Sequence, residues 1–270
     1  MSLFADAVES KDHLIEVWTA LVLDRGGQVD TDDGVVRMWA DSPFGFWNTV
    51  ALDGVEIPAD ALSDQLGRAA AFMRSRTQAG YVWIFEDLLS PPAKAELFDR
   101  AAEAGFELGF TGYGMTGELS IPEPVHPELE FRRVKTADEL LAYGQINASA
   151  YAMSAEAGPA ALAGSEYWLR NTYAYIAYRD GLPVACAATI GGANSVFLAL
   201  VATVPGQTQR GYGEAVTRKA IYEGIKATGH RHLVLHATPA GRPVYERIGC
   251  TINTPVHFLQ LAGADSSAES

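Results

Sequence analysis

Apolar residues along the chain recur with two periods, one typical of amphipathic helices and one typical of strands. In the first half these patterns predict helices over 4–23, 60–76 and 92–104, and strands over 35–40, 47–52, 81–86 and 106–115. In the second half they predict helices over 138–151, 158–171, 211–228 and 242–248, and strands over 129–134, 173–179, 184–190, 195–204, 232–237 and 254–261. Both halves mix the two kinds of element, so we predict the α/β class, with mixed α+β sheets covered by helices.

A proline-rich segment separates the halves. Pro122, Pro124 and Pro127 lie within six residues, and such a segment fits neither a helix interior nor a central strand. We therefore expect a first domain over 1–124 and a second over 125–263. The small polar residues of 264–270 are typical of a disordered tail.

The two halves end alike, each with a short helical pattern, a glycine and a strand. Gly105 closes the first of these patterns and Gly249 the second. Such self-similarity is typical of an internal duplication. One similar helix end also arises by chance, so both interpretations stay open.

The composition indicates which cellular compartment the protein occupies and whether it spans a membrane. Two cysteines in 270 residues cannot form a disulfide framework, which favours a reducing, cytoplasmic environment. The longest mainly apolar run, 196–204, is far shorter than the roughly 20 residues that span a bilayer. The N-terminal residues lack the basic and apolar regions of a secretory signal. We expect neither membrane insertion nor secretion.

The charge is divided unevenly along the chain. The part before Val125 has 21 acidic and 8 basic residues and accounts for the whole net charge of −13, whereas the part after it has 12 of each. The excess of acid disfavours nucleic acid as a partner. The balanced second half still permits a phosphate-bearing ligand, and a cationic acceptor would be attracted to the acidic half.

A glycine loop follows the apolar strand of the second half. This strand ends at Pro205, and a loop containing Gly211 and Gly213 leads directly into a helix. Backbone N–H groups and the helix dipole together form an anion cradle at such a place, and Arg210 adds a full charge. Glycines here are equally compatible with a tight strand-to-helix turn. A Walker loop is excluded, and a dinucleotide fingerprint fits poorly because its third glycine is missing.

Taken together, the loop 205–215 and the later segment 233–250 resemble the GCN5-related N-acetyltransferase (GNAT) superfamily. The resemblance covers residues 128–261, with the elements in the same order. It implies a GNAT-like fold for the second half, with a bulged strand, loop and helix that bind the pyrophosphate of acyl-coenzyme A. It also implies that Tyr245, four residues before Gly249, protonates the leaving thiolate, with Cys250 in place of the usual phenylalanine.

Two alignments of the loop are possible. One places Thr208, Gly211 and Gly213 on the three motif positions, and the other places Arg210, Gly213 and Ala215 there. In either case the resemblance implies that the loop backbone holds the phosphates and that strand residues 200–203 pair with the pantetheine amides. The residues expected to bind the coenzyme are Val201, Thr203, Thr208, Gln209, Arg210, Gly211, Tyr212, Gly213 and Glu214.

The sequence does not identify the catalytic base. The strand that contains the base in many GNAT enzymes has no acidic residue between Ser195 and Thr203. The alternatives are a chain of water molecules or one of five side chains, which are Glu166, Tyr173, Tyr175, His236 and His257. We expect no metal, because His232 and His236 on one strand would stand roughly 13 Å apart, too far for a shared zinc ion.

The first half is predicted to be a degenerate GNAT-like domain without a coenzyme site. Aligning Gly105 with Gly249 places Ala101 at the position of Tyr245. The helix over 60–76 also begins with Asp60, where a phosphate would need positive charge. The aromatic segment 43–48 could line an acceptor pocket, although a buried strand is the preferred interpretation.

These patterns lead to the expectation of an acyl-coenzyme A-dependent N-acyltransferase that transfers acetyl from acetyl-coenzyme A to a primary amine by direct attack in a ternary complex. The expected acceptor is a small molecule or a peptide amine, and a homodimer is compatible with the sequence. The first alternative is a non-catalytic protein that binds or senses acyl-coenzyme A. The second is a nucleotide-binding or interaction module.

Overall fold

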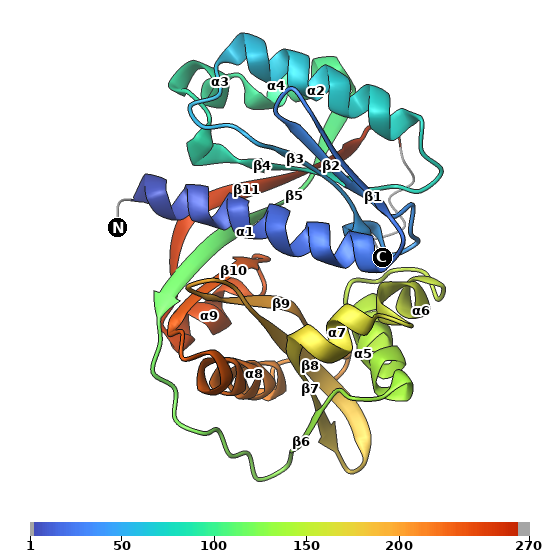
Figure 1. Cartoon of the computed structure of the whole chain (residues 1–270), viewed down its shortest axis with the longest axis vertical. Helices are drawn as coiled ribbons and strands as arrows, with labels where there is room; N and C mark the ends of the chain where they lie inside the picture. The colour runs from blue at the N-terminus through green and yellow to red at the C-terminus, as the bar shows by residue number, and fades with distance from the viewer. Residues whose placement is uncertain (1–2, 264–270) are drawn as a thin grey trace. The chain divides into compact units, whose positions relative to one another are not determined.

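A computed structural model describes residues 3–263 of the chain, which form two compact units (Figure 1). Residues 3–115, 236–243 and 251–263 belong to the first unit, and residues 116–235 and 244–250 belong to the second. The units are therefore not the consecutive segments 1–124 and 125–263 expected from the sequence. The tail 264–270 lies outside the described residues.

The first unit contains a mixed sheet whose strands follow the order β1-β2-β3-β4-β11-β5. These strands are β1 (Gln28–Asp32), β2 (Val35–Trp39), β3 (Asn48–Leu52), β4 (Tyr81–Phe85), β11 (Thr251–Leu261) and β5 (Phe106–Glu118). β3 and β4 are parallel, and β11 is antiparallel to β4. The helices are α1 (Leu3–Asp24), α2 (Ala59–Arg74), α3 (Pro91–Ala95) and α4 (Leu97–Ala104). Figure 1 shows α1 on one face and α2 to α4 on the other.

Side-chain alternation along β4 gives the first unit two apolar layers. Val82 and Ile84 point toward α2 and join a buried cluster that includes Leu66. Trp83 points the other way, with its ring 5.6 Å from that of Trp18 on α1 in an edge-to-face arrangement. The aromatic segment 43–48 is buried as predicted, since Trp47 has no exposed surface, but Gly45–Trp47 form a 3-10 helix rather than the expected strand.

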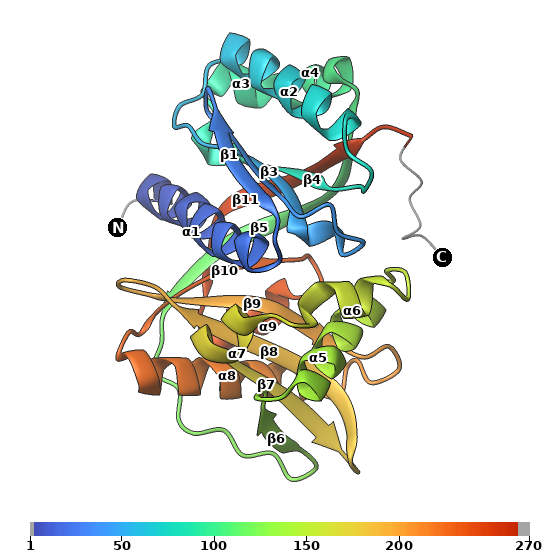
Figure 2. The same ribbon diagram turned by 45° about the vertical axis from the view of Figure 1, so that its right-hand side comes forward.

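The second unit contains the strand order β10-β9-β8-β7-β6. These strands are β6 (Glu130–Arg133), β7 (Thr172–Arg179), β8 (Leu182–Gly191), β9 (Val196–Thr203) and β10 (His232–Ala237). The helices are α5 (Ala137–Ala150), α6 (Ala157–Leu162), α7 (Glu166–Asn171), α8 (Tyr212–Thr228) and α9 (Arg242–Ile248). β9 and β10 are parallel and α8 connects them, whereas the remaining pairs are antiparallel. Figure 2 shows α5 to α7 on one face and α8 on the other.

The last strand of each half does not stay with the elements that precede it. β5 starts in the first unit and ends in the second, where Leu119 N donates a hydrogen bond of 2.8 Å to Arg231 O just before β10. β11 follows the second unit's α9 but lies beside β4 of the first unit. Each of these strands follows a glycine in the left-handed region, Gly105 (φ 87°) or Gly249 (φ 116°). This common order is the one that a duplication predicts.

The structure differs from the sequence prediction where polar residues set local geometry. β1 was not expected because it is mostly polar, and a turn through Asp33 and Gly34, both with positive φ, pairs it with β2. The segment 158–171 forms two helices because Ser165 starts a new one by accepting a hydrogen bond from Trp168 N. The segment 92–104 is likewise divided, at Glu96.

The close packing of α8 on β8 can be tested at Gly224. A Cβ atom added there would lie 2.4 Å from Thr189 Oγ1, whereas one added to the helical Gly67 of α2 would have nothing within 4 Å. Gly67→Ala should stabilise the protein by about 0.5–1 kcal/mol. Gly224→Ala should have a free energy of unfolding about 1–3 kcal/mol lower than that of Gly67→Ala because of overpacking. Urea unfolding would measure both, and equal stabilisation would contradict the packing.

Candidate functional site

A break in the ladder between β8 and β9 marks the candidate site in the second unit. Cys186 pairs with Ala202 and Ala188 with Ala199, so that Leu200 and Val201 both lie opposite one residue of β8. This is a β-bulge. Leu200 has a φ of 48°, in the left-handed region that a leucine rarely adopts. The bulge falls within the strand residues 200–203 that the sequence assigned to pantetheine binding.

Helix α5 contacts both carbonyl groups of the bulge. Tyr143 Oη donates a hydrogen bond of 2.9 Å to Leu200 O, and Asn147 Nδ2 donates one of 3.3 Å to the same atom. Tyr151, directly after the helix, donates from Oη to Val201 O over 3.5 Å. The sequence analysis missed these three residues. Tyr143 and Asn147 are four residues apart within α5, which places them on one face, but this spacing alone does not reveal a contact with the bulge.

The glycine loop provides an uncapped helix start. Gly206, Gln209 and Gly211 all have positive φ, and Gly211 is the N-cap of α8 without a side-chain cap. The first N–H groups of a helix have no partner within it, so those of α8 face the loop as hydrogen-bond donors, with the positive end of the helix dipole. This arrangement suits an anion.

Gly213 has a different reason to be glycine. A Cβ atom there would lie 2.7 Å from Thr203 Oγ1, at the end of β9. Gly211 has open space around it and is required only for its φ of 80°. One glycine thus sets the backbone conformation, and the other lets α8 approach β9.

The side chains of the loop differ in exposure. Thr208, Gln209 and Arg210 are exposed, whereas Tyr212 retains 2% of its surface and donates from Oη to Glu128 Oε2 over 2.7 Å. This hydrogen bond, together with nearby cations that include Arg210, holds the pKa of Glu128 below its usual range. Both loop alignments stay compatible with this geometry, because Thr208 and Arg210 both remain accessible.

Glu214 places a carboxylate in the first turn of α8, where an anionic ligand would be repelled. Arg218 Nη2 lies 2.8 Å from one oxygen, and Arg247 Nε of α9 lies 2.9 Å from the other. Burial alone would raise the pKa of Glu214, but these two guanidinium groups lower it overall. The carboxylate is therefore ionised and neutralised locally, and it links α8 to α9.

Tyr245 lies on α9, with 7% of its surface exposed. The backbone N–H groups of Gly249 and Cys250 both donate to its carbonyl, at 3.1 and 2.9 Å, and close the helix. Burial raises the pKa of the Tyr245 hydroxyl, and the nearby Tyr151 raises it further. The side chain is therefore a neutral hydroxyl.

Each of the five candidate bases has a partner in the structure. Glu166 is exposed and paired with Arg170 on α7. Tyr173 contacts Arg133, and Tyr175 contacts Lys219. His236 contacts Ser10, and His257 contacts both Glu86 and Thr111. His236 and His257 belong to the first unit. No base is assigned.

Across residues 3–263, no group of three metal-ligating side chains comes together, and no helix has the length and apolarity needed to cross a membrane. His232 Nδ1 lies 2.8 Å from Glu118 Oε1. His236 instead contacts Ser10.

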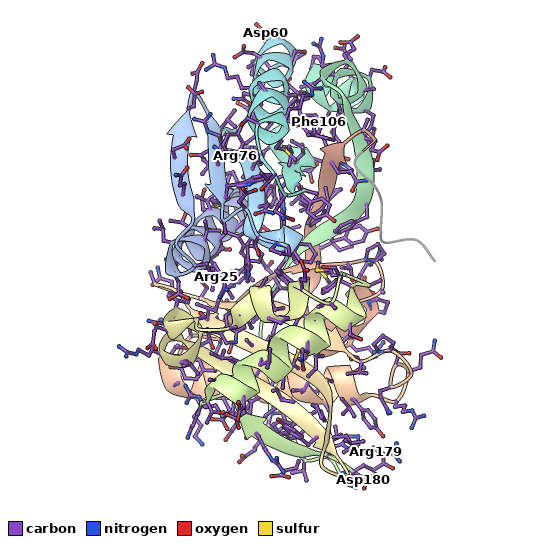
Figure 3. All side chains as sticks on the ribbon, turned by 90° about the vertical axis from the view of Figure 1, so that its right-hand side faces the viewer. Arg25, Asp60, Arg76, Phe106, Arg179 and Asp180 are labelled. Carbon is purple, nitrogen blue, oxygen red and sulfur yellow. The ribbon has the colours of Figure 1, made fainter. Side chains whose placement is uncertain are left out.

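The corresponding region of the first unit is built differently. Helix α2 follows Pro58 rather than a glycine, and Asp60 lies in its first turn (Figure 3). Ala101, which the alignment of Gly105 with Gly249 matches to Tyr245, is buried on α4. The prediction that this unit binds no coenzyme rests on these differences.

Comparison with solved structures identifies the fold. The chain is similar to a GCN5-related N-acetyltransferase from Kribbella flavida, with a TM-score of 0.67 and 17% identity over 94% of this chain and 97% of that one. The chain has the GNAT fold. A GCN5-related N-acetyltransferase from Sphaerobacter thermophilus gives a TM-score of 0.60 and 14% identity over 98% and 96% of the two chains. No family model and no curated protein matches the sequence.

A third comparison also covers residues of both units. A GCN5-related N-acetyltransferase-like protein from Streptococcus suis gives a TM-score of 0.58 and 11% identity over 93% of this chain and 99% of that one. Because these chains match almost from end to end, the likeness in fold covers residues of both units.

The two thiols provide a test of the packing around the site. Cys186 lies against Asn147 at 3.2 Å, and burial raises its pKa above the usual value. Burial also raises the pKa of Cys250 to about 12. Neither thiol should react with a disulfide reagent at pH 8 in the folded protein, because the thiolate is the reactive form. Both should react in urea, and rapid labelling of the folded protein would contradict this packing.

Proposed function

We propose that the protein is an acyl-coenzyme A-dependent N-acyltransferase that transfers acetyl from acetyl-coenzyme A to a primary amine. The observation that carries the proposal is the combination, in one unit of GNAT fold, of a bulged strand, an uncapped glycine helix start and a buried neutral tyrosine. The first two suit a phosphate-bearing extended ligand, and the third suits a thiolate leaving group.

The residues that would bind the coenzyme lie along β9 and the start of α8. Val201 and Thr203 would offer backbone groups to the pantetheine amides by β-augmentation. The backbone of 208–214 would donate hydrogen bonds to the pyrophosphate, with Arg210 adding positive charge. Thr208 and Arg210 are exposed and can reach such a ligand.

The transfer itself would occur by direct attack in a ternary complex. The neutral amine attacks the thioester carbon, a C–N bond forms, and the C–S bond breaks. The departing sulfur takes its proton from Tyr245, while the amine loses a proton to a base that stays unassigned. A well-placed acid of this kind contributes on the order of 10²-fold to the rate.

The acceptor and the cellular setting are part of the same proposal. A small-molecule or peptide amine fits the reaction, and a cationic one is favoured by the acidic residues concentrated before Val125. The first unit, with Asp60 at the start of α2, would bind no coenzyme. We place the protein in the cytoplasm, as a monomer or homodimer without a nucleic acid partner.

Calorimetric titration with acetyl-coenzyme A tests the binding step. The wild-type chain should bind one equivalent, and Gly213→Val should bind much more weakly, because its side chain would collide with Thr203 and push α8 away from β9. Gly67→Ala in the first unit serves as the control and should bind normally. Absence of binding at millimolar ligand in the wild type would contradict the proposal.

Replacement of Tyr245 by Phe tests the catalytic step. Turnover with an accepted amine should fall by about 10²-fold, whereas calorimetric affinity for acetyl-coenzyme A should stay within a factor of about two. Tyr178→Phe, at a tyrosine that contacts Arg132 near the β7–β8 turn, is the matched control. Figure 3 labels that turn at Arg179 and Asp180.

The alternative of a non-catalytic protein is tested by the same assays. The absence of an assigned base is the observation that favours it. A wild-type chain that binds acetyl-coenzyme A but acylates none of a broad amine panel would support a sensing role. Equal turnover of the wild type and Tyr245→Phe would support an enzyme but contradict the role of Tyr245 as its general acid.

A further inference from the structure

The bulge of β9 is held by polar side chains that a regular strand would not need. Leu200 O accepts from Tyr143 Oη at 2.9 Å and from Asn147 Nδ2 at 3.3 Å. The thiol of Cys186, which pairs with Ala202 beside the bulge, lies 3.8 Å from the same oxygen. A carbonyl has two lone pairs, so the tyrosine and the asparagine are sufficient to satisfy it.

These donors are themselves fixed in place. Tyr143 and Asn147 have no exposed surface, and they are one helical turn apart on α5. The ring of Trp168, also fully buried, packs edge to face on Tyr143 with 5.5 Å between centroids. Asn147 Nδ2 additionally donates to Tyr143 O over 3.2 Å. The two donors therefore fix the position of Leu200 O.

The position of this carbonyl determines the orientation of the whole peptide between Leu200 and Val201. The residues that the structure describes contain no cis peptide, and in a trans peptide the C=O and the following N–H point in opposite directions. Holding Leu200 O toward α5 therefore turns Val201 N–H away from α5. A leucine with a φ of 48° keeps this orientation only when its surroundings impose it.

We propose that Tyr143 and Asn147 are positioning residues for acyl transfer, because they hold Leu200 O and thereby aim the Val201 N–H at the thioester of the bound substrate. This inference rests on the proposed function. It adds to that function a buried pair on α5 that contacts no substrate and acts through one backbone peptide. Preorganised backbone donors stabilise the charge that develops on a carbonyl oxygen during acyl transfer.

A second consequence follows from the same bulge. The extra residue sets which residues after Leu200 face each side of the sheet, since a shift of one residue reverses the facing of a strand. With the bulge in place, Thr203 pairs with Ala185 and approaches Gly213 on α8. The clamp formed by Tyr143 and Asn147 contacts the Leu200–Val201 peptide directly and reaches the phosphate loop only through the rest of the strand, so we expect it to influence the catalytic step more than the loop.

The test uses Tyr143→Phe, which removes one oxygen and keeps the ring against Trp168, and Asn147→Leu, which removes the other donor at similar volume. Tyr178→Phe is the control. Each clamp variant should lower kcat for acetyl transfer about ten-fold or more, with KM for acetyl-coenzyme A changed less than about three-fold. The amide resonance of Val201 in nuclear magnetic resonance spectra of the ligand-free protein should shift in both clamp variants and stay in place in the control.

The two measurements separate the inference from the proposed function. If the wild type transfers no acetyl group, the proposed function fails, and the Val201 amide still reports whether the clamp sets this peptide. An unshifted Val201 amide in both clamp variants would overturn the inference. Unchanged kcat alongside a shifted amide would overturn it as well, because the clamp would then be structural only. If one clamp variant does not fold, the other decides both measurements.

Discussion

One interruption of a hydrogen-bond ladder determines how the second unit is arranged. Between β8 and β9 one residue, Ala187, lies opposite two, Leu200 and Val201, and Leu200 takes a left-handed conformation to allow it. β9 then ends where Thr203 meets Gly213. The helix start, its unpaired N–H groups and the approach of α8 to the sheet all follow from this position.

The polar side chains under this interruption explain a feature of α5. A helix packed on a sheet normally presents apolar residues to it, yet α5 presents a tyrosine and an asparagine with no exposed surface. Buried polar groups are costly unless they are hydrogen-bonded. Here the carbonyl that the bulge removes from the ladder is the partner, so the two irregularities compensate each other.

Much of the fold could be predicted from the sequence because apolar periodicity marks most strands and helices. The segments expected at 211–228 and 242–248 correspond closely to α8 and α9. The strand β1 could not be found in this way because its residues are mostly polar, and only the Asp33–Gly34 turn indicates it. The loop glycines and Tyr245 were predicted as site residues from local motifs. Tyr143 and Asn147 were not, because their role depends on a bulge that no local pattern encodes.

Which segments of the chain make up each unit could not be predicted, for a related reason. Periodicity identifies a strand but not its neighbour, and the proline segment suggested a boundary between consecutive halves. In the structure β11 lies beside β4, and its Leu259 joins the buried cluster of the first unit with Val82 and Leu66.

The placement of β11 has a consequence for how the chain folds during synthesis. Residues 3–115 are synthesised long before residue 259. Val82 and Leu66 therefore stay incompletely covered until the second unit has been translated. Contacts of such large sequence separation form late and slowly. The acidic residues before Val125 would keep this unfinished sheet apart from other copies during the delay, since like charges oppose association. The register of β11 thus makes the core of the first unit depend on one of the last segments to be translated.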